Sequence, residues 1–232
     1  MSLKRNRLLA SFSGADLKRL LPNLEEVGLE PGQTLFEPQD RITHAYFPWD
    51  GAVCLLAVSQ DGTATQVGTI GCEGVVGLGG VLAGEISFTR QVVQFAGRGA
   101  RIARGPLINA VNASETMRNK VMVHVDAFTA QNLQSVACNA RHSVEERLAR
   151  WLLTALDRSG QPTLPVTHRA LAEMLAVQRP TITVVARMMS MAGLIRRERG
   201  SITVLDRGGL EDVTCECYGI IKQVYDEAHS AR

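Results

Sequence analysis

The chain has 232 residues, 45% of them hydrophobic and 21% charged, with a formal net charge of +2 at pH 7. These values are ordinary for a globular protein, and the length allows two domains of usual size. No run of about 18 apolar residues is present, which excludes a membrane span, and a charge of +2 does not by itself indicate a nucleic-acid partner.

The N-terminal residues are basic but contain no apolar stretch of signal-peptide length, and Asp16 follows soon after them. We therefore expect a cytoplasmic protein with no membrane partner. Five cysteines are scattered along the chain, and this odd, dispersed set is unlike the disulfide framework of a secreted protein.

Short strands separated by glycine-containing turns dominate the N-terminal half, after a short helical segment expected at 17–24. The pair Asp61-Gly62 between two apolar stretches predicts a hairpin. Because no long helix interrupts these strands, we expect an antiparallel barrel, roll or sandwich. The strands are expected at 34–36, 45–47, 52–58, 65–70, 90–95 and 100–103.

A helix-rich stretch follows from about residue 115 to 157, with no glycine or proline before Gly160. Its apolar residues form more than one stripe, which suits a helix that packs on its own domain and on a partner helix. A purely intramolecular core helix is the alternative. A further helix at 147–156 should pack under the C-terminal unit, and the break at 141–144 is the predicted hinge.

Residues 166–195 have the apolar spacing of two short helices joined by a tight turn. Thr167 is a good N-cap for the first helix, and Pro180 fits only the first turn of the second. The segment IRRERGSITVL that follows resembles a β-hairpin wing. The pattern predicts a winged helix-turn-helix, whose second helix enters a DNA major groove.

Basic residues concentrate in the same region. Between residues 167 and 207, seven arginines against three acidic residues leave a net charge of +4. Arginine is well suited to bidentate contacts with phosphate and guanine, so the cluster favours double-stranded DNA as the partner. The alternative is that these arginines only solvate helix faces.

The order of strands, long helix and winged helix-turn-helix resembles the cyclic-AMP receptor protein/fumarate-nitrate regulator (CRP/FNR) superfamily of bacterial transcription regulators. The resemblance implies an α+β fold with three parts. These are an N-terminal antiparallel β-roll like that of cyclic-nucleotide-binding domains (1–114), a long dimerisation helix (115–140) and a winged helix-turn-helix domain (141–232). It also implies a homodimer that binds two half-sites about 34 Å apart in a roughly palindromic duplex. RNA polymerase is expected as a further partner.

The resemblance carries DNA contacts onto this chain residue by residue. Arg179 takes the position that reads guanine, and Gln178 takes the cap and phosphate role that serine has in the family. Pro180 replaces a glutamate that often reads cytosine, and Val184 replaces a third reader that is often arginine. The other candidate contacts are Thr181, Thr183 and Arg187 on the second helix, His168 and Arg169 at the start of the first, and Arg197 and Arg199 in the wing.

The effector site departs from the family's nucleotide-binding pattern. Gly77-Leu78 stands where nucleotide binders have glycine and the glutamate that holds the ribose. Arg90 matches the phosphate-binding arginine but lacks the small residues after it, and a solvated strand residue is the alternative. Asn132 and Leu133 fall near the purine-facing positions. We therefore expect no cyclic AMP and no other known cofactor, and an unidentified signal.

Metal and enzyme chemistry are not expected. Iron–sulfur members of the superfamily group cysteines ahead of the β-roll, whereas the first cysteine here is Cys54. Cys215 and Cys217 lack a second pair, so a structural role is preferred to a thiol switch. Four of the five histidines, His44, His124, His142 and His229, are interpreted as single surface or core residues. No catalytic motif is present, so the alternative function is a ligand-binding or protein-interaction module that does not bind DNA.

Overall fold

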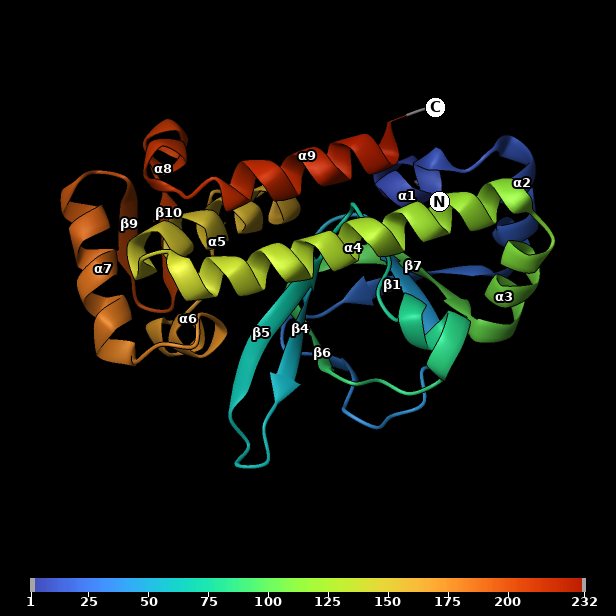
Figure 1. The fold of residues 1–232 in the computed structure, drawn as a ribbon, viewed down its shortest axis with the longest axis horizontal. Coiled ribbons are helices and arrows are strands. Elements are labelled where there is room, and N and C mark those ends of the chain that lie inside the picture. Colours follow the sequence, from blue (N-terminus) through green and yellow to red (C-terminus); the bar gives the residue numbers. More distant parts are fainter. Residues whose placement is uncertain (1–2, 231–232) are drawn as a thin grey trace.

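The computed structural model describes residues 3–230, in which an N-terminal sheet region and a C-terminal helical unit lie along one long helix (Figure 1). This is the expected α+β fold, with antiparallel sheets first and a winged helix-turn-helix last. Within residues 3–230, no helix combines the length and apolar character needed to cross a bilayer.

Short helices precede the sheets. The helix expected at 17–24 begins earlier and ends earlier, because Ser13 caps it through the backbone N–H of Asp16 and Pro22 lies in the 3₁₀ turn that follows. In chain order these elements are η1 (Leu3–Arg5), α1 (Arg7–Ser11), α2 (Gly14–Leu20) and η2 (Leu21–Asn23).

Two antiparallel sheets form the N-terminal region, in the orders β1-β7-β3 and β2-β6-β4-β5. Their strands are β1 (Leu24–Leu29), β2 (Thr34–Phe36), β3 (His44–Pro48), β4 (Ala52–Val58), β5 (Ala64–Ile70), β6 (Arg90–Phe95) and β7 (Gly97–Ala103). All six predicted strands are present, and the hairpin turns at Gly62 with a φ of 82°. Strand β1 was not predicted, because Glu25 and Glu26 interrupt its apolar alternation.

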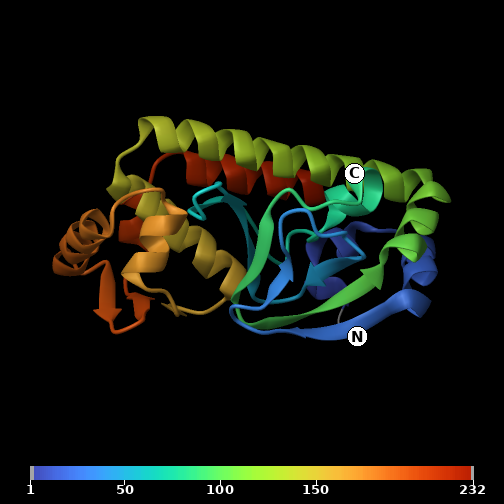
Figure 2. The same ribbon diagram turned by 90° about the horizontal axis from the view of Figure 1, so that it is seen from below.

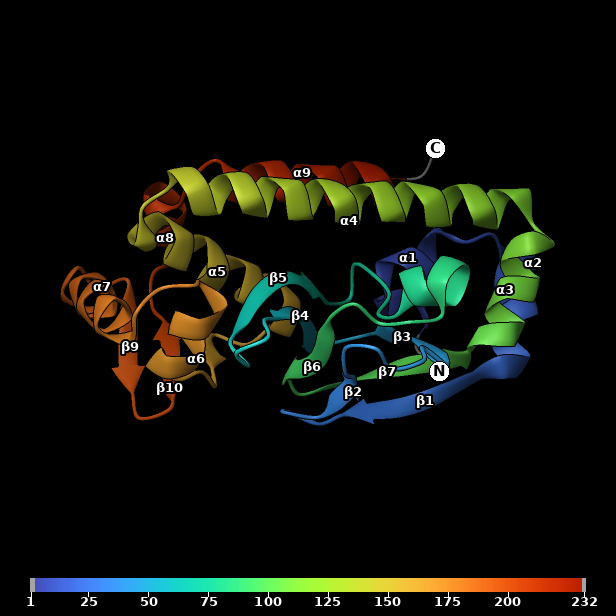
Figure 3. The same cartoon turned by 60° about the horizontal axis from the view of Figure 1, so that its bottom comes forward.

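The chain then forms η3 (Gly80–Gly84), α3 (Arg104–Asn112) and the long helix α4 (Glu115–Arg141). Ser114 caps α4 through the backbone N–H of Met117, and the helix ends where the sequence predicted a break. Helix α4 contacts β5, α3 and α9, and Figure 3 shows it spanning the molecule beside the sheets.

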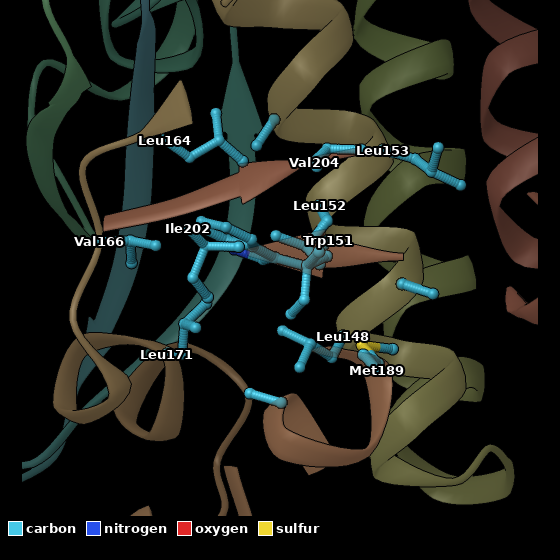
Figure 4. Packing of buried hydrophobic residues seen from close by; sticks show 14 of the residues in the cluster. Leu148, Trp151, Leu152, Leu153, Leu164, Val166, Leu171, Met189, Ile202 and Val204 are labelled. Atoms are coloured by element: carbon cyan, nitrogen blue, oxygen red, sulfur yellow. The ribbon is translucent and has the colours of Figure 1, made fainter. Parts of the chain in front are cut away.

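Helix α5 (Val144–Ser159) starts with a capping box between Ser143 and Glu146 and carries the core of the C-terminal unit. That unit contains β8 (Thr163–Leu164), α6 (His168–Met174), α7 (Arg179–Met191), β9 (Ile195–Glu198) and β10 (Ser201–Val204). Figure 4 shows the shared core of Leu148, Trp151, Leu152, Leu153, Leu164, Val166, Leu171, Met189, Ile202 and Val204. Ala52 and Phe95 of the N-terminal sheet belong to the same core, so the two regions pack directly on each other.

The sequence pattern led to no prediction for the last two helices, α8 (Arg207–Val213) and α9 (Cys217–His229). Helix α9 runs alongside α4, and Figure 2 shows the two helices together along one side of the molecule. Ile221 and Tyr225 pack on Ala127 of α4, and Arg7 near the N-terminus pairs with Asp226 at 2.8 Å.

A buried ion pair joins the two regions. Arg158 of α5 lies 2.9 Å from Glu73 in the loop after β5, and the two side chains are only 8% and 7% exposed. Arg158 also donates to the Gln131 side chain of α4 at 2.7 Å, and Gln131 donates in turn to the carbonyl of Thr69. A Cβ at Gly71 would lie 2.8 Å from the Arg158 side chain, which is closer than Cβ atoms approach other side chains. The loop after β5 therefore needs glycine at this position to pack beside the ion pair.

Removing one partner of this pair should strongly destabilise the fold, because the other charge stays buried and uncompensated. We expect Arg158→Met to lower the free energy of unfolding by about 3–5 kcal/mol, measured by urea denaturation. The matched control is Arg98→Met, which breaks an exposed pair with Glu26 and should cost less than about 1 kcal/mol. Equal losses in the two variants would contradict the role assigned to Arg158.

Candidate nucleic-acid interface

The two helices of the predicted motif form as expected. The Thr167 side chain accepts from the backbone N–H of Ala170 and begins α6, and Pro180 lies in the first turn of α7. The turn between them is sharp, with Ala176 in the left-handed region at a φ of 50°. Arg147 of α5 donates to the carbonyl of Leu175, which fixes this turn on the supporting helix.

Helix α7 has one buried face and one exposed face. Ile182, Ala186 and Met189 are fully buried against α5 and α6, so the opposite face is presented to solvent. The exposed side chains include Arg179, Thr181, Thr183, Val184, Arg187, Met188 and Met191. Every residue predicted on this helix to contact DNA therefore lies on its accessible side.

His168 connects the first helix to the second and lies within the electrostatic influence of the wing residue Arg197. Its Nδ1 is 3.2 Å from the hydroxyl of Thr183, which itself donates to the carbonyl of Arg179. Burial lowers the pKa of His168, and the nearby charges of Arg197 and Arg179 lower it further. The exposed side chains of Arg179 and Arg197 make this surface positively charged, which favours phosphate.

The wing is the hairpin β9–β10, with Arg199 and Gly200 at its turn. Arg197 and Arg199 are exposed, as the predicted phosphate contacts require. Arg169 at the start of α6 is also exposed but lies 3.0 Å from Glu173, which neutralises part of its charge.

The structure modifies the role predicted for Gln178. This residue occupies the N-cap position of α7, but its side chain makes no capping hydrogen bond. The reason is that Pro180 has no N–H, so one donor that a cap would satisfy is already missing. The exposed Gln178 amide is left free to contact a ligand.

A cavity of about 350 Å³ lies between the N-terminal sheet, the segment around η3 and α4. Gly77 and Leu78 line it, together with apolar side chains such as Ile70 and Phe128. Burial and the charge of His229 lower the pKa of the lining residue His124 to about 4, so its ring is neutral at physiological pH. No arginine, lysine or carboxylate is among the described residues that line the cavity.

The four predicted effector residues do not share this cavity. Arg90 and Asn132 are not part of its lining. Arg90 binds both carboxylate oxygens of Glu37 at 2.8 and 3.0 Å, and it faces an open groove that also contains Arg169 and Arg179. The sequence offered no sign of the Glu37 contact, because the two residues are 53 positions apart.

Three of the histidines interpreted as single surface or core residues lie beside other histidine, tyrosine or cysteine side chains. His124 and His229 lie beside each other, with ring centroids 6.0 Å apart, and both rings lie near Tyr225. His142 lies with Cys138, Cys215 and Cys217 in one group whose ligand atoms are all within 4.8 Å of one another. Cys215 and Cys217, which lack a second pair nearby in the sequence, therefore have two further possible ligands beside them in the structure.

Comparison with known proteins assigns the C-terminal unit to a family. Residues 146–213 match the Crp-like helix-turn-helix domain. The chain is 27% identical over 182 residues to the transcriptional regulator SdrP of Thermus thermophilus, covering 76% of this chain and 85% of that protein.

Solved structures share most of the fold. FixK2 from Bradyrhizobium japonicum superposes with a TM-score of 0.70 at 15% identity, covering 83% of this chain and 98% of that one. A CRP/FNR-family transcriptional regulator from Thermus thermophilus gives a TM-score of 0.65 at 23% identity, with 82% and 97% covered. The matched sequence relative is a transcriptional regulator, and the solved structures show that the fold is shared.

The electrostatic coupling around His168 can be tested in the free protein. Removing a neighbouring positive charge favours the imidazolium, so Arg197→Gln should raise the pKa of His168 towards its ordinary value of 6.5. The pKa should stay below that value because burial, the larger cause, is unchanged. NMR titration of the histidine rings measures it, with Arg187→Gln as the control. A pKa that does not move, or moves equally in the control, would contradict this arrangement.

Proposed function

We propose that this chain, a DNA-binding transcription regulator of the CRP/FNR fold, acts as a homodimer on a roughly palindromic duplex. The observation that carries the proposal is the division of α7 into a buried face and an exposed face rich in arginine and threonine. An exposed helix of this kind, supported from behind by α5 and α6, fits the major groove.

In the proposed complex, Arg179 reads guanine through a bidentate contact at the start of α7. Val184 is 58% exposed and offers an apolar contact, such as one to a thymine methyl group. Arg187, Thr181 and Thr183 extend the contact surface along the same helix. Gln178 and His168, together with Arg169, Arg197 and Arg199, bind phosphates and set the position of the protein on the duplex.

The exposed face of α4 supports a second copy of this chain as the dimer partner. Exposed residues recur at positions 122, 126, 129, 133, 136 and 140, which is the alternating spacing of a coiled-coil seam. Met122, Leu133 and Val136 in this series are 57%, 67% and 69% exposed, which is unusual for large apolar side chains. Burying each against a partner helix would contribute about 1.5–3 kcal/mol.

The cavity beside α4 is the proposed effector site. Its apolar lining and the neutral His124 favour a small apolar ligand, whereas a cyclic nucleotide needs a cation for its phosphate. His124, Val125 and Phe128 of α4 form part of the wall, so a ligand there would act directly on the helix of the proposed dimer seam. The ligand would shift the equilibrium between two pairings of α4 and so change the spacing of the recognition helices. RNA polymerase is the further protein partner that we propose.

The role of Arg179 is tested by binding to a duplex that the protein selects from a random pool. Arg179→Ala should weaken binding by roughly 5- to 150-fold, the equivalent of about 1–3 kcal/mol, because a base contact is lost. Binding is measured by fluorescence anisotropy at fixed salt concentration. Arg98→Ala removes the same charge from an exposed position on β7 of the N-terminal sheet and should leave the affinity within about twofold. Similar losses in both variants would mean that Arg179 contributes only charge.

The dimer seam is tested by Leu133→Glu, which places a like-charged pair at the proposed interface. We expect sedimentation velocity to show a monomer at concentrations where the unmodified protein is a dimer. Leu205→Glu changes another exposed leucine, 54% exposed and away from α4, and should remain dimeric. A dimeric Leu133→Glu protein would show that α4 is not the seam.

A further inference from the structure

Four side chains with metal-ligand chemistry meet where the end of α4 contacts the start of α9. Cys138 and His142 lie one helical turn apart at the end of α4, while Cys215 lies between α8 and α9 and Cys217 is the first residue of α9. The Sγ atoms of Cys138 and Cys215 are 3.5 Å apart, and Nδ1 of His142 is 3.5 Å from Sγ of Cys217. The three cysteines are buried, and all are free thiols.

These distances match a tetrahedral zinc site. With Zn–S bonds of about 2.3 Å and Zn–N bonds of about 2.0–2.1 Å, neighbouring ligand atoms in a tetrahedron lie about 3.5–3.8 Å apart. The two contacts given above have nearly this length, and every other pair is within 4.8 Å. We propose that Cys138, His142, Cys215 and Cys217 bind one zinc ion as a closed Cys₃His site.

The surroundings of His142 are those of a metal-binding imidazole. Its Nε2 lies 3.2 Å from a carboxylate oxygen of Glu216, while Nδ1 faces the sulfur atoms. A proton on Nε2 donates to Glu216 and leaves the lone pair of Nδ1 for the ion, which is the common carboxylate–histidine–zinc arrangement. Gln134 supports the site from α4, because its Nε2 donates to Sγ of Cys217 at 3.1 Å.

The charged side chains around the cluster also suit a bound zinc ion. Three thiolates and one Zn²⁺ carry a net charge of −1, which a buried site must balance. Arg147 and Arg150 of α5 both act electrostatically on Cys138. The Nε atoms of both arginines are buried and have no hydrogen-bond partner among residues 3–230. The positive charges of Arg147 and Arg150 can therefore balance the thiolates, and their Nε–H groups remain available as hydrogen-bond donors.

The proposed ion would reinforce the junction between α4 and α9, two helices that already pack along each other. It ties the C-terminal helix to α4 immediately before Ser143, where α5 and the DNA-binding unit begin. Because the metal binds the folded chain and not the unfolded one, it should raise stability by mass action. A disulfide between Cys138 and Cys215 is the competing chemistry, but it would leave Cys217 and His142 without a role.

The test uses the full chain, purified under reducing conditions after growth with added zinc. Elemental analysis should find about one zinc per chain, and replacement by Co²⁺ should give the visible absorption bands of tetrahedral thiolate coordination. Cys215→Ser should lose at least nine-tenths of the metal. The matched control is Cys54→Ser, a buried cysteine of β4 outside the cluster, which should keep it.

A second variant keeps the test decisive if Cys215→Ser does not fold. The Glu216 side chain is 68% exposed and touches the site only through His142, so Glu216→Gln should fold normally. It should lower zinc affinity by about 10- to 100-fold in competition with a metal-binding dye. Less than about one-tenth of an ion per chain after reconstitution, or equal zinc in Cys215→Ser, would overturn the proposal. A Cys138–Cys215 disulfide found under reducing conditions would also overturn it.

Discussion

The buried pair of Arg158 and Glu73 is the contact on which the arrangement of the two regions depends. Both charges are removed from water, so their desolvation is compensated only while α5 keeps its place against the loop after β5. Gln131 extends the same network to α4. One arginine therefore fixes the DNA-binding unit to the sheets and to the long helix at once, and the core that includes Ala52 and Phe95 adds apolar contacts between the two regions.

This constraint bears on how a signal would reach DNA under the proposed function. The sequence predicts a hinge at the break between α4 and α5. In the structure, the capping box at Ser143 fixes the start of α5, and the ion pair of Arg158 holds the other end of that helix in place. A ligand in the cavity touches α4 through Phe128 and Val125 without touching this network. The proposed switch therefore acts first on the pairing of α4 helices, while each DNA-binding unit stays docked on its own chain.

Local patterns in the sequence predicted most of the fold. The helix-turn-helix follows from the apolar spacing around Ile182 and Ala186, with Thr167 and Pro180 marking the helix starts, and these signals depend on nearby residues only. Strand β1 was not predicted, because two glutamates interrupt its alternation of apolar and polar residues.

The effector residues and the cysteine group were predicted less well, because both depend on contacts between distant parts of the chain. Arg90 is hydrogen-bonded to Glu37, and Cys138 contacts Cys215, a residue 77 positions away in the sequence. No spacing rule within one segment reveals such pairs.

The central claim is that two copies of this chain read a symmetric DNA site. The direct measurement is selection of fragments of the source genome by the purified protein, followed by sequencing, with and without cyclic AMP. We predict enriched fragments that share a palindrome with half-site centres about 34 Å apart, and enrichment that cyclic AMP changes less than about tenfold. Enriched fragments without twofold symmetry, or no enrichment above random fragments, would contradict the account.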